Sequence, residues 1–588
     1  MCGIAGEFRF DNQAPDAATM ARMLAKLERR GPDAEGQHAD GAMRLGHRRL
    51  AIIDLSLRSG QPMVDQATGT ALVFNGTLYN YPELRAELIA RGHVFHSDGD
   101  TEVILRAYLE WGEVCVERLH GMFAFAIWNR EELFLARDRL GIKPLYYSEN
   151  LGGFRFASTP QALLAAGGVD TGIDAVALHH LFTLHAVVPA PRTIFNGIRK
   201  LAPGTTLTVN ARGELAHRKY WSLKAQRPAA PRSEAEWTEA IHTSLRQAVK
   251  KRIEIADVKV GVLLSGGLDS SLLVALLAEQ GVPDLMTFSV GFEDQPEERG
   301  NEFEYSDPVA EMYGTRHHKY LIPNPEVLRR LPEAVDQMSE PMFAQDAVAF
   351  YLLAEQVSKT VKVVQSGQGA DEVFGGYFWY PRMQADTAGS DLERFRRHYF
   401  DRDHDEFLEM TMPAYHGPDY TAQTVAAHLA EPFADEFVDQ VLRMDTTMLI
   451  TDDPVKRVDN MTMAWGLEAR VPFLDHQLVE LAASMPPQLK LASEGKHVLK
   501  TIARGRVPDA VIDRKKGYFP MPALKFVRGE FLNFMQDILN SQACRERGLY
   551  HRAYVDKLLD APERHHTRIQ GSKLWHLALL EYWLQKNA

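Results

Sequence analysis

Short apolar runs separated by polar residues characterise the first part of the chain, up to about residue 210. Apolar positions at helical spacing predict helices over residues 20–29 and 81–90. Runs rich in β-prone residues predict strands over residues 51–55, 71–75, 122–128 and 133–136. Several strands with few helices between them favour a sandwich of sheets covered by helices over a series of parallel strand–helix units.

A different pattern begins after Trp221. Residues 224–232 (KAQRPAAPR) are rich in Pro and Ala, which is typical of a linker. Helical and strand patterns then alternate, with helices predicted over 236–252, 270–279 and 347–358 and strands over 258–264, 285–290 and 361–365. This alternation predicts an α/β domain with a parallel sheet, followed by a mainly helical C-terminal part.

Composition places the chain among ordinary globular proteins. Of its 588 residues, 45% are hydrophobic and 24% are charged, which excludes disordered and collagen-like classes. A domain size of about 150 residues would suggest four domains. The motifs described below favour two larger domains instead, over residues 1–215 and 235–588.

Charge and cysteine content exclude further classes. The net charge of −12 argues against a nucleic-acid partner, which needs a basic surface. Cys2, Cys115 and Cys544 are too scattered for a disulfide framework or a zinc site. The sequence shows neither a secretory signal nor a run of about 18 apolar residues, so we expect no membrane association. A cytoplasmic protein fits these observations best.

Cys2 is the first candidate for catalysis. Removal of Met1 would make it the first residue, so that its own α-amino group, with an ordinary pKa of about 7.7–8.0, could serve as the base. Gly3 would let the backbone approach a substrate closely. A cysteine at position 2 is weak support by itself, because an incidental thiol would look the same.

Three further features of the first part suggest a binding pocket. Arg49 lies in the string GHRRL, which opens a strand, and could hold a carboxylate in a bidentate pair. Asn75 and Gly76 end a strand and offer the amide and the backbone N–H that an oxyanion hole needs. Asp100 supplies an anion suited to an ammonium group. Taken singly, the two charges could be surface residues and Asn75-Gly76 a hairpin turn.

Together these strings carry a family resemblance. MCGIAG, RRGPD, GHRRLAIID, FNG, DGDTE and GMFAFAIW, in this order, resemble the class II glutamine amidotransferase domain over residues 1–210. The resemblance implies an N-terminal nucleophile sandwich of αββα layers. It implies that Cys2 attacks the amide of glutamine, that Arg49 and Asp100 hold the α-carboxylate and the α-ammonium group, and that Asn75 and Gly76 form the oxyanion hole.

One position departs from this family. Family members usually have Glu after Asn-Gly, where it also faces the glutamine amino group, whereas this chain has Thr77. The loss of a carboxylate should weaken the binding of the ammonium group. We therefore expect Thr77 to lower the affinity for glutamine more than the activity itself.

A candidate phosphate loop lies in the second part. Leu264, Ser265, Gly266, Gly267, Leu268, Asp269, Ser270 and Ser271 follow an apolar strand and open a helix. Glycines and small hydroxyl residues leave backbone N–H groups free at the positive end of the helix, where phosphate binds well. Asp269 is suitably placed for Mg²⁺. A Ser/Gly turn with a helix cap is the alternative for this string alone.

The second part also carries a family resemblance. SGGLDSS resembles the loop of the ATP-pyrophosphatases, and with SGQGADE…GGY and AWGLEARVPFLD it resembles the synthetase domain of glutamine-hydrolysing asparagine synthetases. The resemblance implies a doubly wound parallel sheet and implies ATP and Mg²⁺ as cofactors. The roles it implies are Mg²⁺ binding by Asp269 and Asp371, adenine contacts by Leu264 and Val290, nucleotide contacts by Ser366 and Gly367, and stabilisation of the phosphates by Lys496.

The implied reaction joins the two domains. A small carboxylate attacks the α-phosphate of ATP, glutamine hydrolysis releases ammonia, and ammonia displaces AMP to leave an amide. Free ammonia would be mostly protonated at neutral pH, so it must cross between the domains shielded from water. Pairing of two glutaminase domains in a homodimer is also compatible with the family, although no local feature indicates it.

The identity of the carboxylate stays open in the sequence. Aspartate is the usual acceptor of the family, but Gln368 replaces the usual Glu of the second loop and cannot take a proton. Residues 338–349 and 379–381 look more like a subgroup thought to amidate N-acetylglutaminylglutamine to an osmolyte. The alternative from another class is an enzyme that has the same ATP-pyrophosphatase loop but acts on tRNA. Such an enzyme would need a basic surface and sulfur-handling cysteines.

Overall fold

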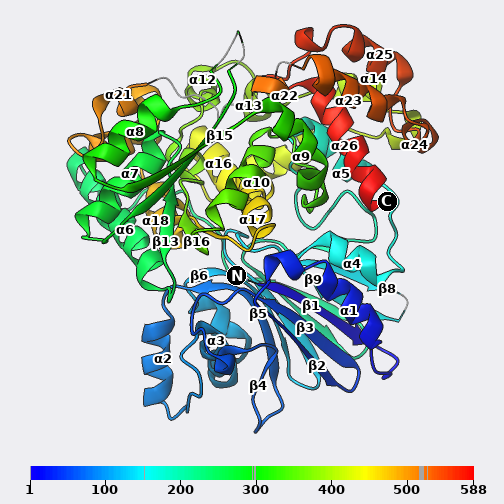
Figure 1. The fold of residues 1–588 in the computed structure, drawn as a ribbon, viewed down its shortest axis with the longest axis vertical. Coiled ribbons are helices and arrows are strands. Elements are labelled where there is room, and N and C mark those ends of the chain that lie inside the picture. The colour runs from blue at the N-terminus through cyan, green and yellow to red at the C-terminus, as the bar shows by residue number, and fades with distance from the viewer. Residues whose placement is uncertain (1, 151, 295, 297–298, 515–521, 526) are drawn as a thin grey trace.

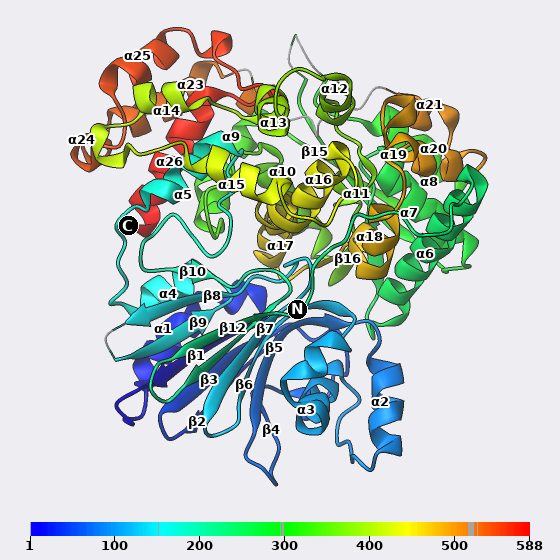
Figure 2. The same cartoon turned by 180° about the vertical axis from the view of Figure 1, so that it is seen from behind.

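The chain folds into two parts that meet at the amino terminus in the computed structural model (Figure 1, Figure 2). The structure describes residues 2–150, 152–294, 296, 299–514, 522–525 and 527–588. Met1, whose removal the sequence predicts, lies outside the described residues.

Two six-stranded antiparallel sheets form the first part. One sheet has the strand order β10-β8-β9-β1-β3-β2, with bounds Arg199–Lys200, Tyr146–Asn150, Gly153–Ala157, Gly3–Arg9, Met43–Arg49 and Ala34–Asp40. The other has the order β12-β11-β7-β6-β5-β4, with bounds Leu215–Lys219, Thr205–Asn210, Glu132–Arg137, Gly121–Trp128, Ala71–Leu78 and Met63–Val64. Ile4, Val73 and Leu135 belong to the apolar layer between the sheets.

Helices cover the two outer faces of this sandwich. Helices α1 (Ala17–Ala25) and α4 (Pro160–Ala166) pack on the sheet of β1, and α2 (Tyr81–Ala90) and α3 (Asp100–Trp111) pack on the sheet of β5. The layers are therefore αββα, which confirms the fold class predicted for the first part (Figure 1).

The predicted strand over residues 51–55 was wrong. These residues form a loop, and the strand ends before them at Arg49. Ile52 is apolar because it is buried against the second part, where its carbonyl oxygen accepts the N–H of Asp257 at 2.9 Å. A short apolar run can be a buried loop as well as a strand, because burial alone selects apolar side chains.

A five-stranded parallel sheet organises the second part. Its strand order is β15-β14-β13-β16-β17, with bounds Arg316–Ile322, Met286–Phe292, Val260–Leu263, Val363–Gln365 and Glu468–Arg470. Helices α6 (Glu234–Glu254) and α7 (Leu268–Glu279) pack on one face, and α10 (Asp346–Val357) and α9 (Asn324–Asp336) pack on the other. The sheet is doubly wound, as predicted.

The remaining helices are α5 (Ala175–Thr183), α8 (Phe303–Met312), α11 (Ala370–Phe374), α12 (Trp379–Ala385), α13 (Asp391–Tyr399), α14 (His404–Met410), α15 (Tyr420–Leu429), α16 (Phe437–Met444), α17 (Lys456–Met463), α18 (His476–Ala483), α19 (Pro487–Leu491), α20 (His497–Ala503), α21 (Asp509–Ile512), α22 (Pro522–Lys525), α23 (Gly529–Asn540), α24 (Gln542–Arg547), α25 (Arg552–Asp560) and α26 (Lys573–Asn587). The C-terminal part is thus helical, as predicted. Within the described ranges, every helix is too short or too polar to cross a bilayer.

Candidate active sites

A small pocket lies at the start of β1, where the two sheets of the first part approach the second part. It has a volume of about 30 Å³, and Cys2, Arg49, Gly76, Thr77 and Asp100 are among the residues that line it. Cys2 is 7% exposed. The structure therefore brings four of the predicted glutamine-site residues to one cavity, although they come from separate strands and a helix.

Asn75 lies beside Cys2 on strand β5. Its Oδ1 accepts the N–H of Cys2 at 3.0 Å, and its Nδ2 is buried with no hydrogen-bond partner among the described residues. A buried amide donor without a partner is costly unless a ligand supplies an acceptor. Gly76 follows it, and a Cβ there would lie 2.2 Å from the carbonyl oxygen of Met122, so only glycine fits.

Arg49 ends strand β3 and is held by the loop that follows. Its Nη1 donates to the carbonyl oxygen of Ser56 at 2.9 Å, and its Nη2 donates to that of Asp54. These bonds fold residues 50–56 back over the guanidinium group. The apolar string after Arg49 therefore serves to orient this side chain at the pocket.

Asp100 begins helix α3 and is 6% exposed. It accepts the N–H of Leu78 at 3.0 Å. Burial, assisted by the negative charge of Glu468, raises the pKa of Asp100 to about 6. Above that pH its carboxylate is ionised, as the binding of an ammonium group requires.

Burial also raises the pKa of the Cys2 thiol, although a backbone hydrogen bond from Leu50 and the charge of Arg49 act in the opposite direction. The thiol is therefore protonated at neutral pH and needs a base to become a nucleophile. The nearby imidazole of His47 has its pKa lowered to about 3 by burial.

Glu468 was missed as part of this site by the sequence analysis. It lies on β17 in the second part, fully buried, and both of its carboxylate oxygens lie within hydrogen-bond distance of Thr77 Oγ1, at 3.2 and 3.3 Å. Burial alone would raise its pKa, but nearby positive charges, those of Arg470 and Lys143 among them, outweigh this and lower the pKa to about 2. The carboxylate of Glu468 thus lies next to the hydroxyl group of Thr77. No local pattern could reveal a contact between residues 391 positions apart.

A second, larger cavity lies at the carboxyl ends of β13 and β16. Between these two strands the strand order reverses direction, and ligands of doubly wound sheets bind at such a point. The cavity has a volume of about 800 Å³. The predicted nucleotide residues that line it are Leu264, Ser265, Gly267, Asp269, Ser270, Val290, Ser366, Gly367, Asp371 and Lys496.

The loop after β13 is shaped by its glycines. Gly266 has a φ of 78°, and a Cβ there would lie 2.9 Å from the backbone nitrogen of Ser306. Gly266 is the one predicted nucleotide residue outside the cavity lining, so it shapes the loop. Gly267 caps helix α7, and Ser265 Oγ lies 3.1 Å from Ser270 Oγ. The positive end of α7 therefore opens into the cavity.

Asp269, Asp371 and Lys496 meet at the floor of this cavity. Lys496 Nζ lies 2.6 Å from Asp269 Oδ2 and 2.6 Å from Asp371 Oδ1. Burial would lower the pKa of Lys496, but the two carboxylates outweigh it and raise that pKa. The carboxylates converge on a single cation, and two oxygen donors suit Mg²⁺, so this pair fits the predicted metal.

The opposite wall of the cavity contains buried acids and aromatic residues. Tyr377 Oη donates to Glu372 at 2.6 Å, and Tyr380 Oη donates to Asp445. Burial, with a contribution from Glu372, raises the pKa of Asp445 to about 8. Gln368 also lines the cavity. A protonated Asp445 would donate a hydrogen bond, which the sequence alone did not indicate.

Buried ion pairs join the two parts between these cavities. Asp459 pairs with Arg30 Nη1 at 2.9 Å and with Lys143 Nζ at 3.0 Å. Lys200 Nζ likewise lies 3.0 Å from Glu340 and 2.5 Å from Asp452. These side chains are almost completely removed from solvent.

Two family models match the chain. Residues 1–221 match the glutamine amidotransferase domain, and residues 240–585 match asparagine synthase. Together the two matches cover nearly the whole chain.

Similar curated proteins are spread over several bacteria. Asparagine synthetase [glutamine-hydrolyzing] 1 of Bacillus subtilis is 32% identical over 100% of this chain and 97% of its own length. Asparagine synthetase [glutamine-hydrolyzing] 3 of the same organism is 32% identical over 95% and 93%. A putative asparagine synthetase [glutamine-hydrolyzing] of Mycobacterium bovis is 33% identical over 97% and 94%. The chain therefore belongs to the asparagine synthase family, with a glutamine amidotransferase domain in front of the synthase domain.

Proposed function

We propose that this chain is an ATP-dependent ligase that takes ammonia from glutamine at the Cys2 pocket and uses it at the large cavity to convert a carboxylate to its amide. The observation that carries the proposal is the placement of the two cavities on either side of one buried interface. A nucleophile with an amide donor lies on one side, and two carboxylates with a lysine lie on the other.

In the first half of the reaction, Cys2 Sγ would attack the side-chain amide of glutamine. The α-amino group of a processed Cys2 would take the thiol proton and pass it to the departing ammonia, which leaves a glutamyl thioester on Cys2. Water would then hydrolyse this thioester, so that glutamate leaves and the thiol is restored. Asn75 Nδ2 and the N–H of Gly76 would stabilise the oxyanion. Arg49 and Asp100 would hold the α-carboxylate and the α-ammonium group. The buried, unpaired Nδ2 of Asn75 supports this role.

In the second half, an acceptor carboxylate would attack the α-phosphate of ATP, and pyrophosphate would leave. Ser265, Gly267, Ser366 and Gly367 would contact the nucleotide, and Leu264 and Val290 would pack on the adenine. Lys496 would exchange its carboxylate partners for phosphate oxygens. Mg²⁺, held by Asp269 and Asp371, would neutralise charge on the phosphates. Ammonia would then attack the acyl carbon and displace AMP.

Transfer of ammonia between the cavities would take place inside the protein. The interface is closed by the buried pairs of Asp459 and Lys200 and by the contact of Thr77 with Glu468. Exclusion of water would keep ammonia unprotonated and able to attack.

Aspartate is the acceptor that we propose first, because the similar curated proteins are named asparagine synthetases. An acylated glutamine dipeptide is the second candidate. Gln368 and the aromatic wall of Tyr377 and Trp379 in a cavity of about 800 Å³ favour this larger substrate.

We also propose that the two domains span residues 1–215 and 235–588, since the chain between β12 and α6 contains neither a helix nor a strand longer than a single bridge. A cytoplasmic location is supported by Cys2, Cys115 and Cys544, which are all free. Pairing of two copies through the first domain is proposed from the family alone.

The first experiment measures pyrophosphate release from ATP, Mg²⁺ and glutamine, with and without each acceptor. Release that depends on aspartate, with asparagine formed, would establish the first candidate. Release that depends on an acylated glutamine dipeptide would establish the second. If neither acceptor causes pyrophosphate release, both candidates are rejected.

Replacement of the nucleophile tests the coupling of the two sites. Cys2→Ala should abolish glutamine-dependent synthesis, because no thiol remains to attack the amide. Synthesis from added ammonia should stay close to that of the unmodified enzyme. Equal loss of both activities in a folded variant would contradict the two-site model.

A further inference from the structure

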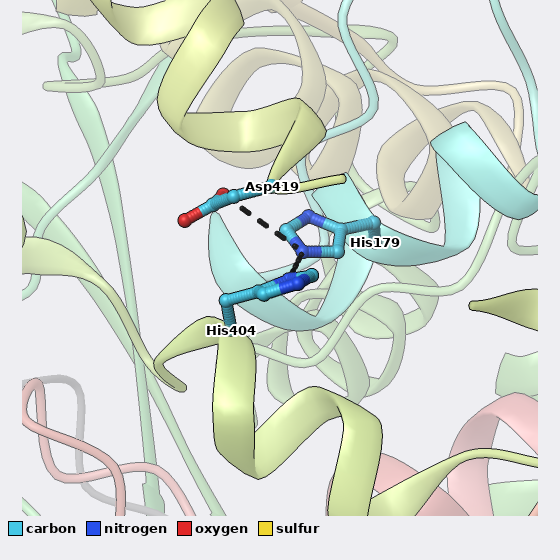
Figure 3. Close-up of side chains that lie close together, drawn as sticks. All are labelled: His179, His404 and Asp419. Atoms are coloured by element: carbon cyan, nitrogen blue, oxygen red, sulfur yellow. Dashed lines mark hydrogen bonds and ion pairs between the residues drawn. The ribbon is translucent and has the colours of Figure 1, made fainter. Parts of the chain in front are cut away.

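Two histidines and an aspartate lie together between helices α5, α14 and α15, and none of them lines either cavity. We call His179, His404 and Asp419 the His179 cluster (Figure 3). His179 Nε2 lies 3.0 Å from His404 Nδ1 and 3.9 Å from Asp419 Oδ1. In Figure 3 both neighbours face the same nitrogen of His179.

A hydroxyl group holds the His179 ring in this orientation. Thr421 Oγ1 lies 2.7 Å from His179 Nδ1 and 3.0 Å from His180 Nδ1. His179 is 1% exposed, so its ring is fixed by these neighbours rather than by solvent. When Nδ1 donates its proton to Thr421 Oγ1, Nε2 presents its lone pair to His404 and Asp419, which is the tautomer in which histidines bind metals.

We propose that the His179 cluster binds a divalent transition metal ion of the zinc type. Zinc ligands at about 2.0–2.1 Å in a tetrahedral site lie about 3.3 Å from each other. The separations of 3.0 and 3.9 Å bracket this value, so small side-chain shifts complete the geometry. His404 and Asp419 are partly exposed, which leaves an entry path and room for water as the fourth ligand.

The other contacts of Asp419 orient it for this role. Its Oδ1 accepts the N–H of Ala422 at 2.9 Å and so caps α15, and its Oδ2 pairs with Arg396. Ligating carboxylates are commonly fixed by such additional hydrogen bonds. The same atoms could instead form a metal-free hydrogen bond between two histidines, and the test below separates the two states.

A second group of two histidines and an aspartate is less suited to a metal ion. His185, Asp401 and His576 also converge, but Arg402 Nη1 lies 3.4 Å from His576 Nδ1. That guanidinium group faces the ring nitrogen that would have to bind the metal, whereas Arg396 in the His179 cluster pairs with Asp419 Oδ2 and leaves Oδ1 toward His179. The contrast singles out the His179 cluster.

A bound ion would connect distant parts of the chain. Helix α5 precedes the linker, whereas α14 and α15 follow it by more than 170 residues. The ion would therefore fasten the end of the first family match to the helical part of the second. We expect the melting temperature to rise when the metal is added.

The test is a titration of untagged, chelator-treated protein with Co²⁺, followed by its visible absorption, and then displacement by Zn²⁺. Excess Mg²⁺ is present throughout to occupy sites made only of oxygen ligands. We expect one Co²⁺ per chain with the absorption of a tetrahedral site. His404→Asn and Asp419→Asn should weaken binding at least about 100-fold, and Asn can still cap α15.

His428→Asn is the matched control, since it removes another imidazole from α15 without touching the cluster. It should bind Co²⁺ like the unmodified protein. Thr421→Val should weaken binding by about 10–100-fold through the lost orientation of His179. Equal Co²⁺ binding by all variants, or no tetrahedral absorption in the unmodified protein, would overturn the proposal. The readout is independent of amide synthesis.

Discussion

Burial sets the charge of the residues that matter most at the Cys2 pocket. The Cys2 thiol is kept protonated, and Asp100 titrates far closer to neutrality than an ordinary carboxyl group. Glu468, whose charge acts on Asp100, is kept ionised by Arg470. Each of these states depends on neighbours that are distant in the sequence.

The binding of glutamine should therefore depend on pH. In the Cys2→Ala variant, whose thiol no longer titrates, the Kd for glutamine should rise about tenfold per pH unit below about 6, because protonated Asp100 cannot hold an ammonium group. Calorimetric titration between pH 5 and 8 measures this. Adding Asp100→Asn should give weak binding with a flat profile. A flat profile with Asp100 present would contradict the role of this residue.

At the scale of the element, the turn after one short helix controls whether the charged groups at the floor of the large cavity can meet. The turn that follows α11 brings Gly376 against the cavity floor. A Cβ at Gly376 would lie 2.1 Å from Asp371 Oδ1 and 2.2 Å from Lys496 Cε. A side chain at this position would have to displace both groups, so glycine lets Asp371 and Lys496 meet as they do.

Replacing this glycine should separate the charged groups. Gly376→Ala should lower pyrophosphate release at least about 100-fold, since displacements of about 1 Å at reacting groups have effects of that size. Glutaminase activity should stay unchanged. Gly152→Ala is the control, because Gly152, like Gly376, has no positive φ, whereas a Cβ there would meet open space. Similar losses in both variants would indicate general strain instead.

Much of the element pattern could be predicted from the sequence, for a physical reason. The helix over 81–90 and the alternating elements after residue 235 follow from local periodicity. The strand expected over 51–55 failed because Ile52 is buried by another domain. The motif strings supplied the residues of both cavities, but not Glu468 or Asp445, whose positions depend on tertiary packing.

At the scale of the whole molecule, the two parts are joined by buried charges as well as apolar contacts. Asp459 holds Arg30 and Lys143 together in a region without solvent. Burial would raise the pKa of Asp459, but the two cations outweigh it and lower that pKa. The ion pairs of Asp459 with Arg30 and Lys143 should therefore stabilise the fold near neutral pH.

Removal of that charge should be costly. Asp459→Asn leaves two buried cations without their partner and should destabilise the protein by about 3–5 kcal/mol. Asp33→Asn, at the partly exposed pair with Lys362, should cost less than about 1 kcal/mol. Melting temperatures of the two variants make the comparison. A larger fall for Asp33→Asn would contradict the assignment.

Acid should diminish the difference between Asp459→Asn and the unmodified protein. A carboxyl group with a lowered folded pKa stabilises the fold above its unfolded pKa of about 3.9, and the effect is lost as the pH falls through the folded pKa. The two melting temperatures should converge below about pH 4. A gap that persists at low pH would indicate a packing defect in the variant.

The enclosure of Cys2 has a practical consequence for anyone producing this enzyme. Its backbone N–H donates a hydrogen bond to Asn75 Oδ1 at 3.0 Å beside the small pocket of the first part. An affinity tag fused ahead of Cys2 would have to leave through that pocket and would block the amino group. The other end of the chain, at helix α26, lies beside α4, where Gln161 Nε2 donates to Asn587 Oδ1 at 3.2 Å, and it is well separated from the amino terminus (Figure 1, Figure 2). An affinity tag is therefore best placed at the carboxyl terminus. A protein tagged at the amino terminus should use added ammonia for amide synthesis but should not use glutamine.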